Sequence, residues 1–425
     1  MKSSKLSSFL IGALLVIGLY FPTSQGGIIS KEMQYLFSGV LFVLLTPLLL
    51  SQGGAMGGWS VPNAMAISGL LFLATLASPF TSVAYGAFVP VLLFSVVYSL
   101  RLKDLPLTRM HGRLFAAAHL VNLTCGTLII LEEPVVLQFI GDHYAAAYPE
   151  LVANMLIQQK PVLMFHSHSV AAFYFYLFFF LAFRTYSATQ GRLYIVFALG
   201  YLVLTCWVNS FTAYALLALA LIQICRGFGW ARTRTLGVVA VVALAAVVAV
   251  GPSEYTVDEL WWRVGETLAS PANGWQGRYS GSGGLTSNLE YIARNPFSPI
   301  GLGFSEQLVY GDSGPVIYMI RGSVPLLVAV YGGLFLFFWK NLRSRRDALF
   351  LFLVYTGFEV GYGNLEYLRT QYLLPFLVVY MNSLPDPARV LGTVAVGRAA
   401  GVRGALANAD LAYSRRMTQP TRHLA

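Results

Sequence analysis

The sequence predicts an all-α polytopic membrane protein with about 12 transmembrane helices. Hydrophobic residues make up 56% of the 425-residue chain, whereas Asp, Glu, Lys and Arg together make up 11%. A water-soluble domain of this length cannot place so much apolar surface in its interior. The apolar residues also gather in long runs, and the length of these runs defines the predicted helices.

Each predicted span is a run of about 17 to 25 mainly apolar residues, which is the length that crosses a hydrocarbon core of about 30 Å as a helix. No signal-peptide cleavage pattern follows the first run, so we expect it to remain as a span. The runs are 6–22, 34–50, 61–79, 83–100, 112–131, 162–183, 192–208, 210–225, 235–251, 316–339, 347–363 and 370–385.

The charged residues predict that the N and C termini are both cytoplasmic. With the N-terminus inside, 21 of the 28 Lys and Arg residues fall in cytoplasmic segments and seven fall outside, whereas 14 of the 18 acidic residues fall outside. Lys and Arg accumulate in the cytoplasmic loops of membrane proteins. The net charge of +10 therefore reflects topology and contact with the anionic headgroups of membrane lipids, and we expect no nucleic-acid partner.

We expect a single transmembrane domain over residues 1–385 and a disordered, basic cytoplasmic tail over 386–425. Two periplasmic loops, 132–161 and 252–315, are longer than turns, and the larger one lies between spans nine and ten. Pro149 is predicted to begin a helix in the headgroup layer, because proline favours the first helical position and an apolar face follows it. That face contains Leu151, Val152, Met155 and Leu156.

The polar passage 277–321 contains a predicted short helix. Ser287 and Glu290 have the spacing of a capping box, in which each side chain bonds a backbone amide at the start of a helix. Arg294 follows Glu290 by four residues, which predicts an ion pair on one helix face. Asn295 and Pro296 are expected to end the helix, and Gly301-Leu302-Gly303 is expected to turn the chain after it.

Three arginines of this passage, Arg278, Arg294 and Arg321, are candidates for binding a diphosphate. A guanidinium group matches two phosphate oxygens at once and stays charged at physiological pH. The alternative is that these arginines pair with nearby carboxylates or lie at the membrane interface. This alternative is strongest for Arg294, because Glu290 is one turn away.

Asp312 is the first candidate for a catalytic base that takes a proton from a sugar hydroxyl. It lies in a Gly-Asp-Ser-Gly sequence before a span, where an aspartate can also serve only to form the turn. Glu290 and Glu306 remain alternatives for the base. The acidic pair that holds a divalent ion on a diphosphate is missing, so we expect neither a metal nor a cofactor.

Four more residues are weaker candidates for the site. His166 and His168 have a spacing that begins some metal sites, but no further ligands accompany them, so hydrogen bonding at the interface is favoured. Glu359 lies about one turn from the outer end of a span, where it either serves a function or reaches water. Arg369 is one of the seven outer cations.

The passage from Arg278 through 292–296 (IARNP) and 300–303 (IGLG) to Asp312 resembles the second half of bacterial O-antigen polymerases and ligases. This family is similar to the Wzy-type exopolysaccharide polymerases, and the resemblance covers about residues 160 to 340. Two positions depart from the family pattern. Phe211 stands where many members carry an arginine, and Asp312 stands where ligases tend to have histidine, which favours a polymerase.

The resemblance implies a glycosyltransferase of the bacterial inner membrane. Such an enzyme polymerises polyprenyl-diphosphate-linked oligosaccharide repeat units into O-antigen or exopolysaccharide on the periplasmic face, without a metal or cofactor. On this model Arg278 matches the family's loop arginine, and a chain-length regulator and other polysaccharide-assembly proteins are expected partners.

The alternatives are an O-antigen ligase, a secondary transporter or lipid-linked glycan flippase, and a non-catalytic assembly partner. Transporters tend to carry ionisable groups near the middle of the membrane and to consist of two similar halves. In this sequence charges avoid the centres of the spans, and the large loop occurs only in the second half. An enzyme is therefore the favoured prediction.

Overall fold

The computed structural model is built from α-helices. It describes residues 2–21, 31–50, 60–80, 88–105, 109–145, 149–165, 167–225, 285–296, 299–303, 313–365 and 367–384, together with residues 262, 265, 266, 269 and 308. Within these ranges there is no β-strand, so the all-α prediction is confirmed for the part of the chain that is described.

Most of the described helices overlap the predicted apolar runs, whereas the helices over 134–144, 149–157 and 286–294 lie outside them. The helices are α1 (Lys2–Tyr20), α2 (Lys31–Leu50), α3 (Ser60–Leu76), α4 (Phe88–Tyr98), α5 (Arg109–Ile130), α6 (Pro134–Tyr144), α7 (Pro149–Ile157), α8 (His168–Thr189), α9 (Arg192–Trp207), α13 (Thr286–Arg294), α14 (Gly314–Asn341), α15 (Arg345–Gly361) and α16 (Leu368–Ser383). A further apolar helix spans Phe211–Cys225.

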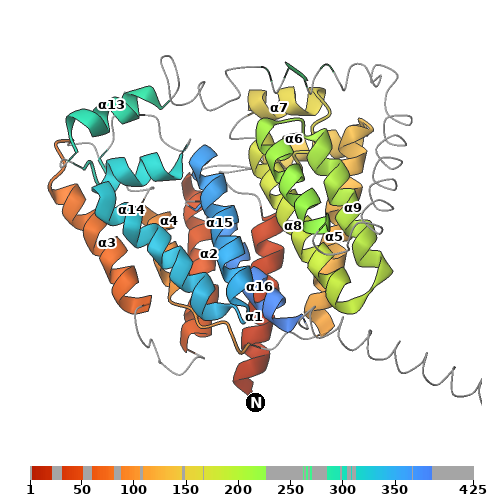
Figure 1. Ribbon diagram of the computed structural model, residues 1–425, viewed down its shortest axis with the longest axis horizontal. Coiled ribbons are helices and arrows are strands. Elements are labelled where there is room, and N and C mark those ends of the chain that lie inside the picture. The colour runs from red at the N-terminus through yellow and green to blue at the C-terminus, as the bar shows by residue number, and fades with distance from the viewer. Residues whose placement is uncertain are drawn as a thin grey trace, which may run out of the picture.

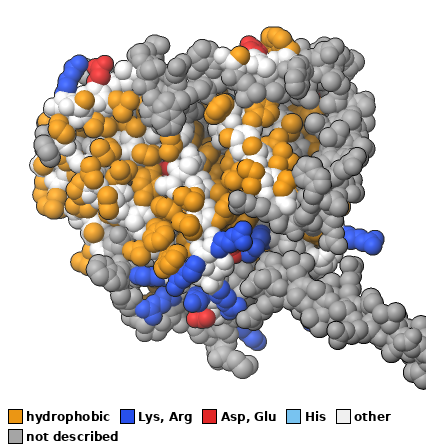
Figure 2. All heavy atoms as spheres, in the orientation of Figure 1, with side chains coloured by type: hydrophobic (Ala, Val, Ile, Leu, Met, Phe, Trp, Pro, Cys, Tyr) orange, Lys and Arg blue, Asp and Glu red, His pale blue; other side chains and the backbone are white. Residues whose placement is uncertain are grey.

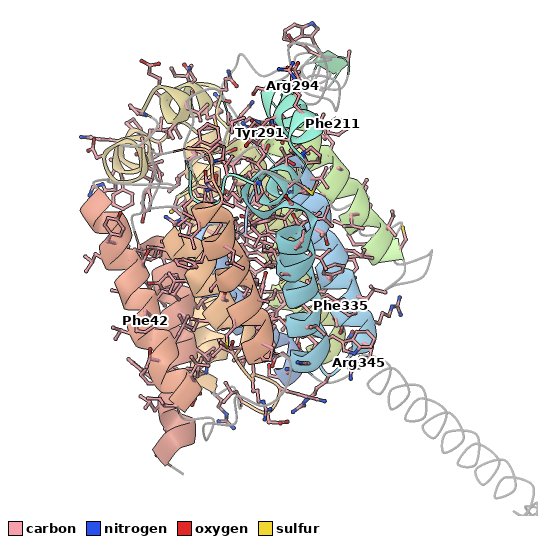
Figure 3. All side chains as sticks on the ribbon, turned by 90° about the vertical axis from the view of Figure 1, so that its left-hand side faces the viewer. Phe42, Phe211, Tyr291, Arg294, Phe335 and Arg345 are labelled. Carbon is pink, nitrogen blue, oxygen red and sulfur yellow. The ribbon has the colours of Figure 1, made fainter. Side chains whose placement is uncertain are left out.

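The long helices lie side by side, and the bundle has two distinct ends (Figure 1). Helices α6, α7 and α13 lie at one end, called here the α13 end, and α1 begins at the other. Lys and Arg side chains gather at that second end, the basic end (Figure 2). Figure 3 shows the same separation, with Arg294 at the α13 end and Arg345 at the basic end.

Three helices, α5, α8 and α14, are long and apolar enough to cross a membrane. Shorter apolar helices accompany them, and large apolar side chains such as Phe42 are exposed on the flank of the bundle (Figure 3). These features support a membrane protein. The number of 12 spans and their orientation stay predictions, and the predicted span 235–251 lies outside the described residues.

Helix α14 departs from the prediction of one continuous span over 316–339. Its backbone is not helical at Gly322 and Ser323, and Ser323 has a φ of 58°. Pro325 explains the break, because a proline ring clashes with the carbonyl of the residue four positions earlier, here Arg321. In Figure 1 the short half of α14, residues 314–321, lies across the α13 end, and the long half, 324–341, runs down the bundle.

The helix predicted to begin at Pro149 is confirmed as α7, and its place in the headgroup layer stays a prediction. On its apolar face Val152, Met155 and Leu156 are buried within the protein, and Leu151 is 45% exposed. The sequence prediction missed α6 in the same segment. Its local signal is Pro134 at the first position of the helix.

Arg369 joins α16 to the end of α1. Its guanidinium donates to the carbonyls of Gly18, Leu19 and Phe21 at 3.0, 2.7 and 3.0 Å, and its side chain is buried. The last carbonyls of a helix lack partners within the helix and carry negative partial charge, so a cation at this position stabilises the helix end. The structure therefore assigns Arg369 a role in packing.

Arg369→Ala should lower the free energy of unfolding by about 2 to 4 kcal/mol, because it removes several charge-assisted hydrogen bonds to buried carbonyls. Thermal unfolding of the detergent-solubilised protein measures the change. Arg192→Ala is the control, since it removes an exposed cation at the start of α9 and should leave the melting temperature nearly unchanged. Equal melting temperatures for the two variants would contradict the capping role.

Candidate functional site

The short half of α14 is held at its C-terminal end by the turn at 300–303. Because Pro325 breaks the helix, the carbonyls of Ile320 and Arg321 are available to neighbouring backbone, and they accept bonds from the amides of Ile300 and Gly301, each at 2.9 Å. Gly301 has a φ of +56°, so the predicted glycine turn is confirmed. An added Cβ there would lie 2.3 Å from the Thr75 nitrogen, which shows how closely the turn approaches the end of α3.

Arg321 lies inside this junction. Its side chain is 4% exposed, and Nη1 donates to the Gly301 carbonyl at 3.1 Å. The sequence prediction placed Arg321 at the end of the polar passage 277–321, as one of the seven outer cations and a diphosphate ligand. The structure instead buries its positive charge at the C-terminal end of the short half, where the guanidinium also ties the helix to the glycine turn.

Glu359 of α15 lies at the other end of the short half. Its side chain is fully buried, so the alternative that it reaches water is wrong. Oε1 accepts a bond from the Leu365 amide at 2.5 Å and Oε2 accepts one from the Tyr331 hydroxyl at 3.4 Å. The carboxylate lies against Gly314, where the amides at the start of α14 carry positive partial charge and stabilise an anion.

Glycine is required at position 314 by this close approach. A Cβ built on Gly314 would lie 1.9 Å from Glu359 Oε2. Seven residues separate Gly314 from Arg321, which corresponds to two helical turns, about 10 Å, and to the same helix face. The short half therefore has the buried carboxylate of Glu359, from α15, against its first residue and its own buried cation, Arg321, at the other end.

Tyrosine side chains lie near the carboxylate, and a buried asparagine follows α15 in the chain. The rings of Tyr318 and Tyr331 meet edge to face with centroids 5.8 Å apart, and Tyr98 lies close enough to Glu359 to interact with it electrostatically. Asn364 is fully buried, and neither of its amide atoms has a hydrogen-bond partner within the described ranges. A buried amide with unused hydrogen-bonding capacity can bind a hydroxyl group or a water molecule.

The sequence prediction missed Asn364 altogether. Its only local signal is a polar residue in the short Gly-Tyr-Gly-Asn segment between two apolar runs. The next residue links this segment to the site, because the Leu365 amide donates to the Glu359 carboxylate.

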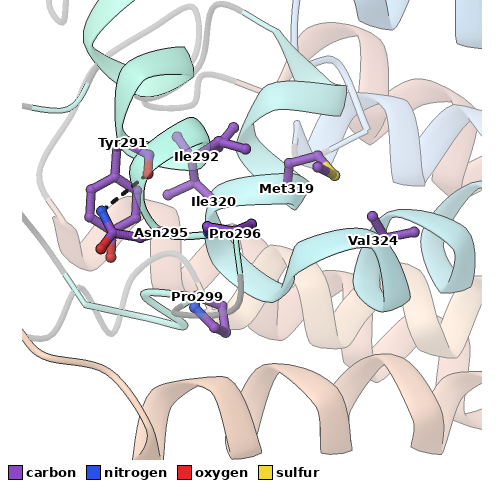
Figure 4. Close-up of a pocket in the computed structure, with 8 residues that line it drawn as sticks. All are labelled: Tyr291, Ile292, Asn295, Pro296, Pro299, Met319, Ile320 and Val324. Carbon is purple, nitrogen blue, oxygen red and sulfur yellow. Dashed lines mark hydrogen bonds between the residues drawn. The ribbon is translucent and has the colours of Figure 1, made fainter.

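Helix α13 packs beside the break in α14, and a pocket of about 250 Å³ lies between them (Figure 4). Most of its lining is apolar, and the Asn295 side chain donates to the Tyr291 carbonyl at 3.2 Å within it. Val324 on its edge is 54% exposed, and Val328, one turn further along α14, is 62% exposed. The pocket is lined by Tyr291, Ile292, Asn295, Pro296, Pro299, Met319, Ile320 and Val324.

The pocket is therefore continuous with an exposed apolar stripe on the long half of α14. In a membrane such a stripe contacts lipid chains, because water is absent and apolar side chains lie on the outside of the bundle.

Arg294 lies on α13, next to residues that line the pocket. Its guanidinium pairs with Glu290 at 3.1 Å, so the predicted ion pair is confirmed. The pair is exposed, with 76% of the Arg294 side chain accessible. The predicted capping box is wrong: the N-cap residue is Leu285, and no side chain caps the helix.

The other weaker candidates lie elsewhere. His168 is the first residue of α8, with Ser167 as its N-cap. No group of three or more His, Cys, Asp or Glu residues suited to a metal ion occurs in the described part of the chain. Arg369 lies near Tyr144 of α6, where burial raises the pKa of the tyrosine and the guanidinium partly opposes that rise.

Arg278, Asp312, Glu306 and His166 lie outside the described residues, so their roles stay predictions. Chain connectivity alone relates Asp312 to the site, since it directly precedes Ser313, the fully buried N-cap of α14. Phe211, which begins the helix Phe211–Cys225, lies at the α13 end (Figure 3).

The chain matches no protein-family model, and searches of curated proteins and of solved structures return no significant match. These comparisons neither support nor contradict the resemblance described from the sequence, which depends only on the residues quoted for it. Of these, the turn at 300–303 and the helix end at Asn295 are parts of the site that the structure describes.

Proposed function

We propose that the protein is a membrane glycosyltransferase that polymerises polyprenyl-diphosphate-linked oligosaccharide repeat units on the periplasmic face of the bacterial inner membrane. The observation that carries this proposal is the break in α14. The short half has the buried Arg321 at one end, the buried Glu359 carboxylate of α15 against the other, and a mainly apolar pocket beside it whose edge includes the exposed Val324.

Such a site suits a substrate that is part lipid and part sugar. The hydrocarbon chain of the donor occupies the pocket beside α13, and its diphosphate lies near Arg278 and Arg321. Arg278 is the main ligand of the diphosphate, and Arg321 adds positive charge from the end of the short half. Hydroxyl groups of the sugar bind near Asn364.

The reaction is a single displacement at the anomeric carbon of the donor. An acceptor hydroxyl forms the new C–O bond while the bond from the anomeric carbon to the diphosphate breaks, and the lipid diphosphate leaves. Asp312 takes the proton of the acceptor hydroxyl. Negative charge develops on the departing diphosphate, so guanidinium groups stabilise the transition state more than the ground state.

Lipid-linked glycan transport is the second candidate function, because broken helices also occur in transporters. Transporters often use discontinuous helices whose half-helix ends face the substrate. In this structure the N-terminal end of the short half faces the Glu359 carboxylate, and the short half lies at the α13 end of the bundle. This arrangement favours the transferase, or a related O-antigen ligase, over a transporter.

One experiment separates these functions. Purified protein in proteoliposomes is supplied with a polyprenyl-diphosphate oligosaccharide and with a second, glycolipid acceptor, and products are resolved by gel and mass spectrometry. The proposal expects longer glycans together with free lipid diphosphate. Intact substrate moved to the other leaflet would instead establish a flippase, and transfer to a different lipid acceptor would establish a ligase. Unchanged substrate would contradict both enzymatic functions.

A further inference from the structure

A cluster of exposed cations lies at the basic end of the bundle, and the fold assembles it from two distant segments. Two members are on the segment that follows α4, and the others are at the junction of α14 and α15. Figure 2 shows blue side chains gathered over this end. The basic cluster consists of Arg101, Lys103, Lys340, Arg343, Arg345 and Arg346.

Two buried asparagines bring these segments together. Asn341 accepts a bond from the Leu102 amide at 2.7 Å and donates to the Leu100 carbonyl at 3.0 Å. Asn382 of α16 donates to the Asn341 carbonyl at 2.6 Å and accepts from the Arg343 amide at 2.9 Å. These bonds fix the backbone beside the cations, so the two segments that carry the cluster are held next to each other.

One exposed acid, Asp104, lies beside Lys103 among the six cations of the cluster. Asp347, the acid nearest to it on α15, pairs with Arg184 of α8 at 2.5 Å. Lys103, Arg343 and Arg346 form no ion pair with any acid that the structure describes. Arg345 is turned toward Trp339, with its guanidinium carbon 4.3 Å from the ring centroid.

An apolar stripe begins directly beside the cations. Leu349 and Leu353 follow Arg345 by four and eight residues on α15, so they lie on the same helix face, and they are 47% and 57% exposed. A ligand that fits this surface combines negative charge with hydrocarbon. A soluble polyanion would use the cations and leave the stripe uncovered.

We propose that the basic cluster is a binding site for one anionic phospholipid. Its phosphate contacts Lys103, Arg343 and Arg346, and an acyl chain lies along Leu349 and Leu353. The site is separate from the proposed transferase site at the α13 end, and it holds the ends of α4, α14 and α15 at the membrane surface. Guanidinium and ammonium groups are the side chains that bind phosphate best.

Native mass spectrometry of the detergent-solubilised full chain, titrated with phosphatidylglycerol or phosphatidylcholine, tests the proposal. The wild type should bind phosphatidylglycerol at least tenfold more tightly than phosphatidylcholine. The triple variant Lys103→Ala, Arg343→Ala, Arg346→Ala should lose that preference. The matched control Lys5→Ala, Arg113→Ala, Arg192→Ala removes the same charge from exposed positions on α1, α5 and α9 and should keep it.

Three outcomes would overturn the proposal. They are equal binding of the two lipids, an equal loss of preference in both triple variants, and full displacement of the lipid by soluble polyphosphate. If the triple variant does not fold, Arg346→Ala alone serves, with an expected loss of about threefold in affinity for phosphatidylglycerol. Wild-type affinity in that single variant would also count against the site.

Discussion

Arg278→Ala should reduce polymer formation by at least about 100-fold, because removing one group that stabilises transition-state charge typically costs a factor of about 10² to 10³ in rate. On the proposed resemblance to O-antigen polymerases and ligases, Arg278 corresponds to the loop arginine of that family. The measurement is the glycan ladder formed by the purified variant from a lipid-diphosphate substrate, at equal amounts of membrane-inserted protein.

Arg294→Ala is the matched control for this prediction. Both changes remove one arginine from the same polar passage, but the Arg294 guanidinium is exposed and paired with Glu290, so its loss should change polymer formation less than about threefold. An undiminished ladder with Arg278→Ala would overturn the proposed role. Equal losses in the two variants would show that the total charge of the passage matters and not Arg278 itself.

Gly314→Ala should destabilise the protein by about 2 to 3 kcal/mol, the cost typical of an added group in a well-packed site. The new Cβ would lie 1.9 Å from Glu359 Oε2, so the carboxylate has to move away from the start of α14 and its bond from the Leu365 amide weakens. Thermal unfolding in detergent measures the loss. We also expect slower polymer formation, since the short half would lose one of its two fixed ends.

Gly332→Ala in the long half of the same helix is the control. A Cβ at Gly332 meets no atom within 4 Å, so this change should be neutral or slightly stabilising. Glu359→Asp, which shortens the side chain by one methylene, should restore part of the stability lost in Gly314→Ala. If the two glycine variants melted at the same temperature, the carboxylate would not lie against Gly314.

Local sequence signals determined several features of this protein. Composition and the length of the apolar runs predicted a helical membrane protein, because burial in a bilayer requires apolar side chains along a whole span. The pair Glu290 and Arg294, the helix end at Asn295 and the turn at Gly301 were predicted from spacing within a few residues. Each depends on backbone preferences or contacts within one or two turns.

Only the tertiary structure decided where the buried charges lie. Arg321 contacts a carbonyl 20 residues away, and Arg369 contacts α1 across about 350 residues, so no local pattern could show that either is buried. The residues around Pro325 do signal a break in α14. The break leaves a short half that is fixed between the glycine turn and Glu359. This arrangement depends on how α3, α13 and α15 pack around the short half. Freed carbonyls and a buried carboxylate both require hydrogen-bond partners, and here other elements provide them.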